Sequence, residues 1–73
     1  MNKYKIKYLT NYIHSLGRLP TDQWGQVLSA DELMGWFGLD KYLNEYEKAC
    51  MKMELVAMVD AELFMEQFRL KVL

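Results

Sequence analysis

A chain of 73 residues has room for one small domain, because a protein this short buries only about 60% of its unfolded surface. With 52% hydrophobic and 14% aromatic residues and a net charge of −1, the composition is globular and excludes intrinsic disorder. The single cysteine excludes an intramolecular disulfide, and no apolar run approaches the roughly 20 residues of a membrane-spanning helix. We therefore expect one domain over residues 1–73, located in the cytoplasm and not bound to a membrane.

The N-terminal residues fit two different periods. Residues 3–8 alternate between lysine and an apolar side chain, which is the pattern of a half-buried strand. A helix competes with this interpretation, because Tyr4, Tyr8 and Tyr12 are spaced by four residues. We expect a short extended or β segment at 3–7 and a helix at 8–16, which ends at Gly17 because glycine readily adopts the left-handed conformation.

The centre of the chain carries a helix-start signal. Ser29 and Glu32 have the spacing of a capping box, which predicts a helix that begins at residue 30 and stops at Gly38. Asp40 then resembles the cap of a further helix, and Asp60 predicts a bend or a new cap before a last helix. Residues 68–73 alternate again and could pair with the N-terminal segment as a two-stranded ribbon.

These patterns predict a mainly α fold. We expect a small single-domain helical bundle with a short extended or β N-terminal segment and a helix-turn-helix-like central hairpin. The residues expected to be mainly buried are Trp24, Leu33, Trp36, Phe37, Leu43, Tyr46, Met53, Phe64 and Phe68.

The chain has few of the residues that catalysis or metal binding requires. The chain has one histidine, His14, and one cysteine, Cys50, which lies in the apolar stripe of a predicted helix. Two such ligands are too few for a zinc site, and the glycines match no phosphate-binding loop. We expect no enzymatic activity, no cofactor and no metal.

The charge is distributed unevenly along the chain. Residues 1–18 carry four cations and no acid, whereas residues 22–66 carry ten acids against three lysines. The lysine and tyrosine stretch allows nucleic-acid stacking, strand addition to a protein partner, or simple coverage of the core. We interpret it as the docking element for a protein, with these candidate contact residues: Lys3, Tyr4, Lys5, Ile6, Lys7, Tyr8 and Arg18.

The segment from Ser29 to Asp40 resembles the first helix and turn of a helix-turn-helix. In that motif the next helix enters the major groove of DNA with basic or amide side chains. Here the following residues include Asp40, Glu45 and Glu47, and acids are the wrong charge for a polyanion. We therefore expect no strong direct DNA binding.

Two stretches, Met1-Asn-Lys-Tyr-Lys-Ile-Lys-Tyr-Leu9 and Trp24-Gly-Gln-Val-Leu-Ser-Ala-Asp-Glu-Leu33, resemble the small RNA polymerase-binding proteins of lytic phages of plant-pathogenic bacteria. The resemblance implies a non-enzymatic regulator, active in the infected host cell, that inhibits transcription initiation and promotes antitermination. It also implies docking on the N-terminal part of the largest polymerase subunit, together with an elongation factor. The alternatives are a small helix-turn-helix DNA-binding repressor and a structural or oligomerising helical domain.

Overall fold

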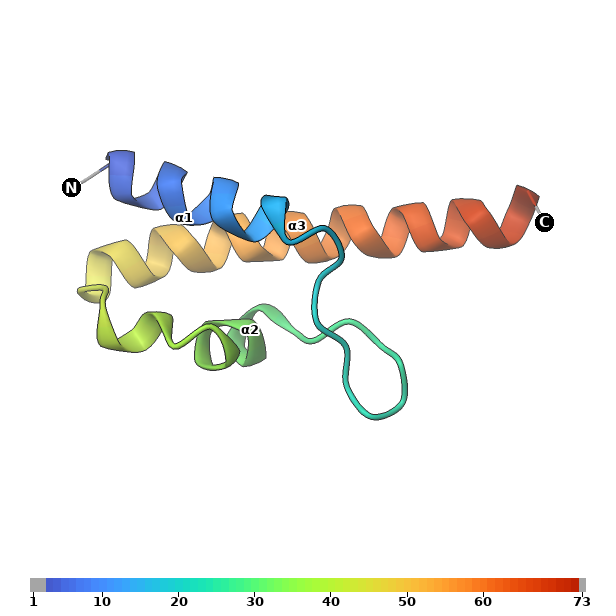
Figure 1. The fold of residues 1–73 in the computed structure, drawn as a ribbon, viewed down its shortest axis with the longest axis horizontal. Helices are drawn as coiled ribbons and strands as arrows, with labels where there is room; N and C mark the ends of the chain where they lie inside the picture. Colours follow the sequence, from blue (N-terminus) through green and yellow to red (C-terminus); the bar gives the residue numbers. More distant parts are fainter. Residues whose placement is uncertain (1–2, 73) are drawn as a thin grey trace.

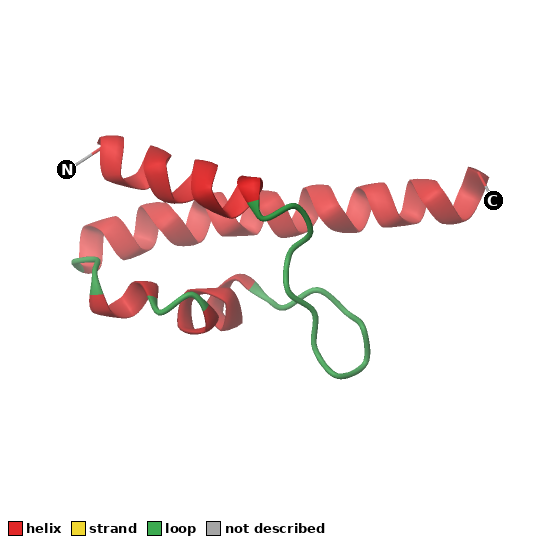
Figure 2. Cartoon of the chain, in the orientation of Figure 1, coloured by secondary structure: helices red, strands yellow, loops and turns green. Residues whose placement is uncertain are grey.

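The chain forms three α-helices and one short 3-10 turn. The computed structural model describes the backbone of residues 3–72 and the side chains of residues 4–68. In chain order the elements are α1 (Lys3–Ser15), α2 (Ala30–Trp36), η1 (Leu39–Lys41) and α3 (Glu45–Val72). The mainly helical fold predicted from the sequence is confirmed (Figures 1 and 2).

Helix α3 is the central element of the molecule. Both α1 and α2 pack against it, from opposite sides in the view of Figure 1. The C-terminal half of α3 continues beyond the end of α1, which makes the molecule 43 Å long and only 23 × 18 Å across. The loop between α1 and α2 crosses α3 and projects on the same side of α3 as α2, beside that helix (Figure 1).

The hydrophobic core lies where the three helices meet. Helix α3 contributes Met51, Leu55 and Met58, whose spacing of four and three residues places them on one face. Leu33 of α2 is fully buried in the same cluster. The remaining buried apolar residues are Ile6, Ile13, Leu19, Ala30, Met34, Leu39 and Leu43.

The predicted capping box at the start of α2 is present. The Ser29 hydroxyl accepts a hydrogen bond from the Glu32 amide at 3.3 Å, and the Glu32 carboxylate accepts one from the Ser29 amide at 3.4 Å. Helix α2 begins at Ala30, as predicted, and ends at Trp36, two residues before Gly38 with its left-handed φ of 66°. Two otherwise unpaired amides at the helix start are thereby satisfied.

We expect Ser29→Ala to lower the free energy of unfolding by about 1 kcal/mol, because the Glu32 amide loses its acceptor. Urea denaturation followed by circular dichroism measures this change. Ser29→Thr keeps a hydroxyl at the same place and serves as the matched control. Equal losses for both variants would show that the cap contributes nothing.

The extended N-terminal segment is the first prediction that is wrong. Residues 3–7 belong to α1, which runs without a break to Ser15, and Gly17 follows with φ 87°. Ile6 and Ile13 are buried seven residues apart, whereas alternation would have grouped Ile6 with Tyr4 and Tyr8. The C-terminal ribbon is wrong for the same reason, since α3 stays helical to Val72 and an isolated two-stranded ribbon is only marginally stable.

Both predicted aspartate caps are also wrong. Asp40 lies inside η1. The residue that caps α3 is Asn44, whose side-chain oxygen accepts a hydrogen bond from the Glu47 amide at 2.8 Å. The connection between α2 and α3 is therefore eight residues, 37–44, longer than the short turn expected for the central hairpin. Asp60 is exposed in the middle of α3 and interrupts nothing, because a carboxylate that points into water does not need to end a helix.

Six of the nine residues predicted to be mainly buried are largely exposed. Leu33 and Leu43 are buried as predicted, and Phe37 is half-buried. Helix α3 has apolar side chains on several faces, and its Met51, Leu55 and Met58 face packs inward in place of the predicted one. The exposed residues are Trp24, Trp36, Tyr46, Met53, Phe64 and Phe68.

Candidate protein-binding surface

Helix α1 presents three tyrosines to solvent along one face. Tyr4, Tyr8 and Tyr12 follow one another at intervals of four residues, and their exposed fractions are 85%, 70% and 51%. Ile6 and Ile13 on the opposite side hold the helix against α3. We call Tyr4, Tyr8 and Tyr12 the tyrosine face.

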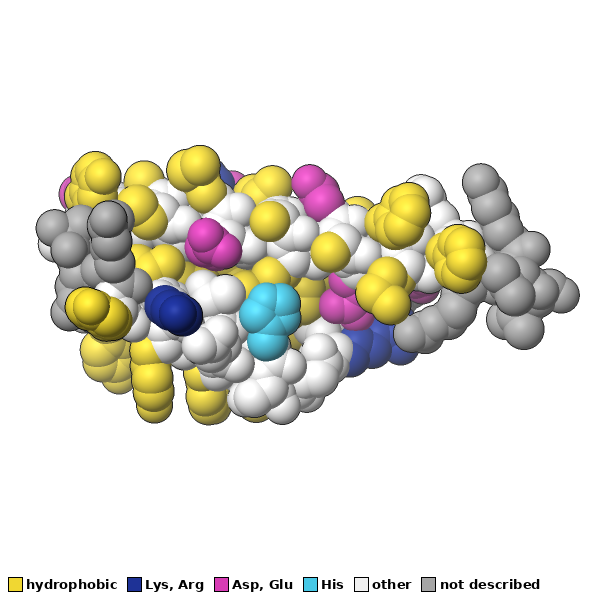
Figure 3. Space-filling model, turned by 90° about the horizontal axis from the view of Figure 1, so that it is seen from above, with side chains coloured by type: hydrophobic (Ala, Val, Ile, Leu, Met, Phe, Trp, Pro, Cys, Tyr) yellow, Lys and Arg dark blue, Asp and Glu magenta, His cyan; other side chains and the backbone are white. Residues whose placement is uncertain are grey.

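The surface of the molecule around α1 and α3 is rich in apolar side chains. Seen from above, hydrophobic side chains lie along one long edge of the molecule and along the left part of the other, with several charged side chains and a histidine between them (Figure 3). Isolated exposed apolar residues are ordinary, but a contiguous set of large aromatic ones marks an interaction site. Tyrosine is well suited to such a site, because it combines a large contact area with few rotatable bonds.

Lys5 has an intramolecular role. Its ammonium group donates a hydrogen bond to the Tyr42 carbonyl at 2.6 Å and lies 3.6 Å from the Glu47 carboxylate. Glu47 is buried and also accepts the Asn44 amide at 3.1 Å. Lys5 therefore ties α1 to the start of α3 and to the residue that follows η1.

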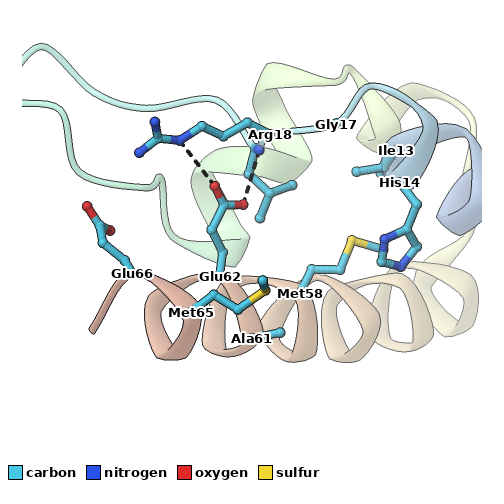
Figure 4. A pocket seen from close by; sticks show the side chains of 10 residues that line it. Ile13, His14, Gly17, Arg18, Met58, Ala61, Glu62, Met65 and Glu66 are labelled. Carbon is cyan, nitrogen blue, oxygen red and sulfur yellow. Dashed lines mark hydrogen bonds and ion pairs between the residues drawn. The ribbon is translucent and has the colours of Figure 1, made fainter. Parts of the chain in front are cut away.

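Arg18 also makes an intramolecular contact. Its Nε lies 3.4 Å from Glu62 Oε1, while Glu62 Oε2 accepts the backbone amide of Leu19 at 3.1 Å. Figure 4 shows Glu62 reaching from α3 to both groups. This contact fixes the start of the loop that follows α1 to α3.

A pocket of about 350 Å³ opens beside this contact, between the end of α1 and α3 (Figure 4). Met58, Ala61 and Met65 line it on the α3 side, and His14 lies at the end of α1. The lining is mainly apolar and offers no nucleophile next to a base. The pocket can accommodate an apolar side chain, but it has no constellation for catalysis.

The structure separates the seven predicted contact residues into distinct groups. Tyr4, Tyr8 and Lys7 are exposed on α1, whereas Ile6 is in the core. Lys5 is half-buried and Arg18 is exposed, and both make the ion pairs described above. The side chain of Lys3 lies outside the described residues.

Sequence reasoning missed Tyr12 as a member of the exposed face and Glu47 and Glu62 as the anchors of two predicted contact residues. The four-residue spacing from Tyr4 to Tyr12 was the signal for the first of these. The spacing of Asn44 and Glu47, which is again that of a reciprocal cap, was the signal for Glu47. No sequence pattern indicated that Glu62 reaches the loop after α1.

Comparisons with known proteins give no family for this chain: no family model matches it, and neither the curated proteins nor the solved structures include a significant match. Within residues 3–72, no helix combines the length and the apolar character needed to cross a membrane. Among the described side chains, no group of three or more His, Cys, Asp or Glu could hold a metal ion.

Proposed function

We propose that this protein is a phage-type regulator that binds bacterial RNA polymerase through protein–protein contact, inhibits initiation and promotes antitermination. The observation that carries the proposal is the tyrosine face of α1, three large aromatic side chains exposed in one row. The resemblance of residues 1–9 and 24–33 to phage polymerase-binding proteins supplies the partner. The docking site on that partner would be the N-terminal part of the largest subunit, and an elongation factor would join the complex.

The tyrosines and the lysine of α1 would have different roles in docking. Tyr4, Tyr8 and Tyr12 would fill apolar pockets of the polymerase, which is how a few aromatic anchors supply most of the affinity in protein interfaces. Lys7, exposed next to this face, would meet an acidic rim and speed the encounter. Occupying a polymerase surface needed for promoter opening would block initiation without any catalytic step.

Tyr8→Ala is expected to raise the dissociation rate of the polymerase complex about fivefold or more, because an aromatic anchor contributes about 1–3 kcal/mol. Biolayer interferometry with purified bacterial core RNA polymerase measures this rate. The matched control is Phe64→Ala, since Phe64 is 68% exposed but lies on the half of α3 beyond the end of α1. The far-ultraviolet circular dichroism of both variants must match the unsubstituted protein.

Two results would contradict different parts of this proposal. If Tyr8→Ala dissociates no faster than the control Phe64→Ala, the docking surface is not the tyrosine face. If the unsubstituted protein does not bind core or holoenzyme polymerase at micromolar concentration, the proposed function itself is wrong.

Binding to plain duplex DNA separates this proposal from the helix-turn-helix repressor. The first turn of α3, in the place of a recognition helix, carries Glu45 and the buried Glu47. We expect no mobility shift of duplex DNA at physiological salt, because phosphate contacts from cations provide most of the affinity in such complexes. Sequence-specific nanomolar binding by the purified protein would favour the repressor.

A further inference from the structure

The loop between α1 and α2 is a closed hairpin with its own hydrogen bonds. Thr21 and Val27 form an antiparallel bridge, and the Asp22 amide donates to the Gln26 carbonyl at 2.7 Å. One residue farther from the tip on each side, the Leu28 amide donates a hydrogen bond to the Pro20 carbonyl at 3.2 Å. Figure 2 shows this hairpin standing away from the helices.

The tip of the hairpin is held by one aspartate. Asp22 Oδ1 accepts hydrogen bonds from the backbone amides of Trp24 and Gln26, each at 2.9 Å. The Asp22 carbonyl accepts a third hydrogen bond, from the amide of Gly25 at 3.0 Å. Gly25 has φ 80°, a conformation that residues with side chains rarely adopt. The backbone on both sides of Trp24 is thus fixed.

The base of the hairpin is fixed to the body of the protein. Leu19 is buried and donates its amide to Glu62, and Val27 and Leu28 pack against the core from the other strand of the hairpin. Yet the side chain of Trp24, the largest in the loop, is 77% exposed. A fixed backbone that holds an indole in water is suited to binding. The loop backbone is already ordered in the free protein, so little further conformational entropy is lost when a partner binds.

The charge of the segment that carries Trp24 indicates the chemistry of the partner. No lysine or arginine occurs from residue 19 to residue 40, a stretch that contains Asp22, Asp31, Glu32 and Asp40. Arg18, just before it, is paired with Glu62, and Asp31 is paired with Lys52 of α3, so Asp22 is the charged residue of the hairpin itself. This composition disfavours DNA, RNA and anionic membranes, whose phosphates would be repelled. It favours an apolar pocket on a protein, with lysine or arginine at its rim.

We propose that Trp24 is the anchor of a second contact with RNA polymerase, in which the indole enters an apolar pocket with a basic rim. This inference rests on the proposed function. The contact differs from the one at the tyrosine face, because α1 carries cations and its partner patch must be acidic. Two contacts from separate elements of one rigid protein raise the affinity of the complex beyond that of either alone.

The first measurement compares binding of variants to purified bacterial core RNA polymerase. Trp24→Ala is expected to weaken the equilibrium affinity at least tenfold, and Trp24→Phe less, because it keeps part of the apolar contact. Trp36→Ala is the matched control, since Trp36 is also exposed but lies at the end of α2 against Phe37. Circular dichroism confirms that each variant is folded.

The second measurement follows the indole itself. 5-Hydroxytryptophan placed at position 24, with Trp36→Phe, is excited selectively in the presence of the tryptophans of the polymerase. Quenching of its emission by acrylamide is expected to fall severalfold when polymerase is added. The same label at position 36, with Trp24→Phe, should stay accessible.

Each outcome decides between the proposals. Loss of affinity in Trp24→Ala together with shielding of the label supports the second contact. Unchanged affinity, or a label that remains quenched in the complex, overturns it and leaves the proposed function standing, whereas absence of any polymerase binding overturns both. The second contact is also overturned if the label at position 24 is protected from acrylamide equally well in the absence of polymerase. Such protection could come from duplex DNA, from phosphatidylglycerol vesicles or from self-association, which sedimentation detects.

Discussion

Leu33→Ala is expected to lower the free energy of unfolding by about 2–5 kcal/mol, the range for removing a fully buried leucine side chain. Leu33 has no exposed surface and belongs to the core cluster that joins α2 to α3. A chain of 73 residues is stable by about 4–11 kcal/mol in total. The substitution therefore removes a large share of that stability and should lower the thermal midpoint by about eight degrees or more.

Leu63→Ala is the matched control for this experiment. Leu63 is on α3 and partly exposed, so the same chemical change should cost less than about 1 kcal/mol. Urea denaturation followed by circular dichroism measures both variants under one set of conditions. Similar losses for the two variants would mean that α2 does not contribute the packing that the structure shows.

Lys5→Glu is expected to destabilise the fold by about 1–3 kcal/mol, because it removes the partner of a buried polar group. The Lys5 ammonium group donates to the Tyr42 carbonyl and lies next to the buried Glu47 carboxylate. Glutamate at position 5 would place a second negative charge beside Glu47. The lysine stretch thus holds the fold together at this position, in addition to any part it has in docking.

Lys7→Glu is the matched control, since Lys7 is exposed and two residues further along α1. We expect its free energy of unfolding to change by no more than about 0.5 kcal/mol, and its association with polymerase to become slower and more dependent on salt. If Lys7→Glu unfolds the protein as readily as Lys5→Glu, the ion pair with Glu47 is not the cause. Charge reversal of all three lysines at once would mix both effects.

The helix boundaries set by local signals could be predicted from the sequence. Ser29 and Glu32 define the start of α2, and Gly17 and Gly38 adopt the left-handed conformation after α1 and α2. These features depend on residues a few positions apart, so they are the same in any tertiary setting. Asp60 shows the limit of such rules, because a good cap residue inside a helix stays harmless when it faces water.

The candidate binding surface could be predicted only in part. The sequence indicated that the N-terminal lysines and tyrosines were unusual, and Tyr4, Tyr8 and Lys7 are indeed exposed. It placed Tyr4 and Lys7 on an extended segment and began the helix only at Tyr8, because six alternating residues fit a strand as well as the first turns of a helix. Trp24 was assigned to the core, since nothing in the local pattern showed that Asp22 would fix its backbone at the tip of a hairpin.

By itself the sequence determined the fold class, the capped start of α2 and the glycines that follow α1 and α2, because these depend on composition and local hydrogen bonding. Only the tertiary structure decided which apolar face of α3 is buried. Its Met51, Leu55 and Met58 face and its Tyr46 and Met53 face are both apolar, and the positions of α1 and α2 make the first the core. The same packing leaves the tyrosine face and Trp24 in solvent, because three helices and one loop cannot cover every aromatic side chain of a chain this small.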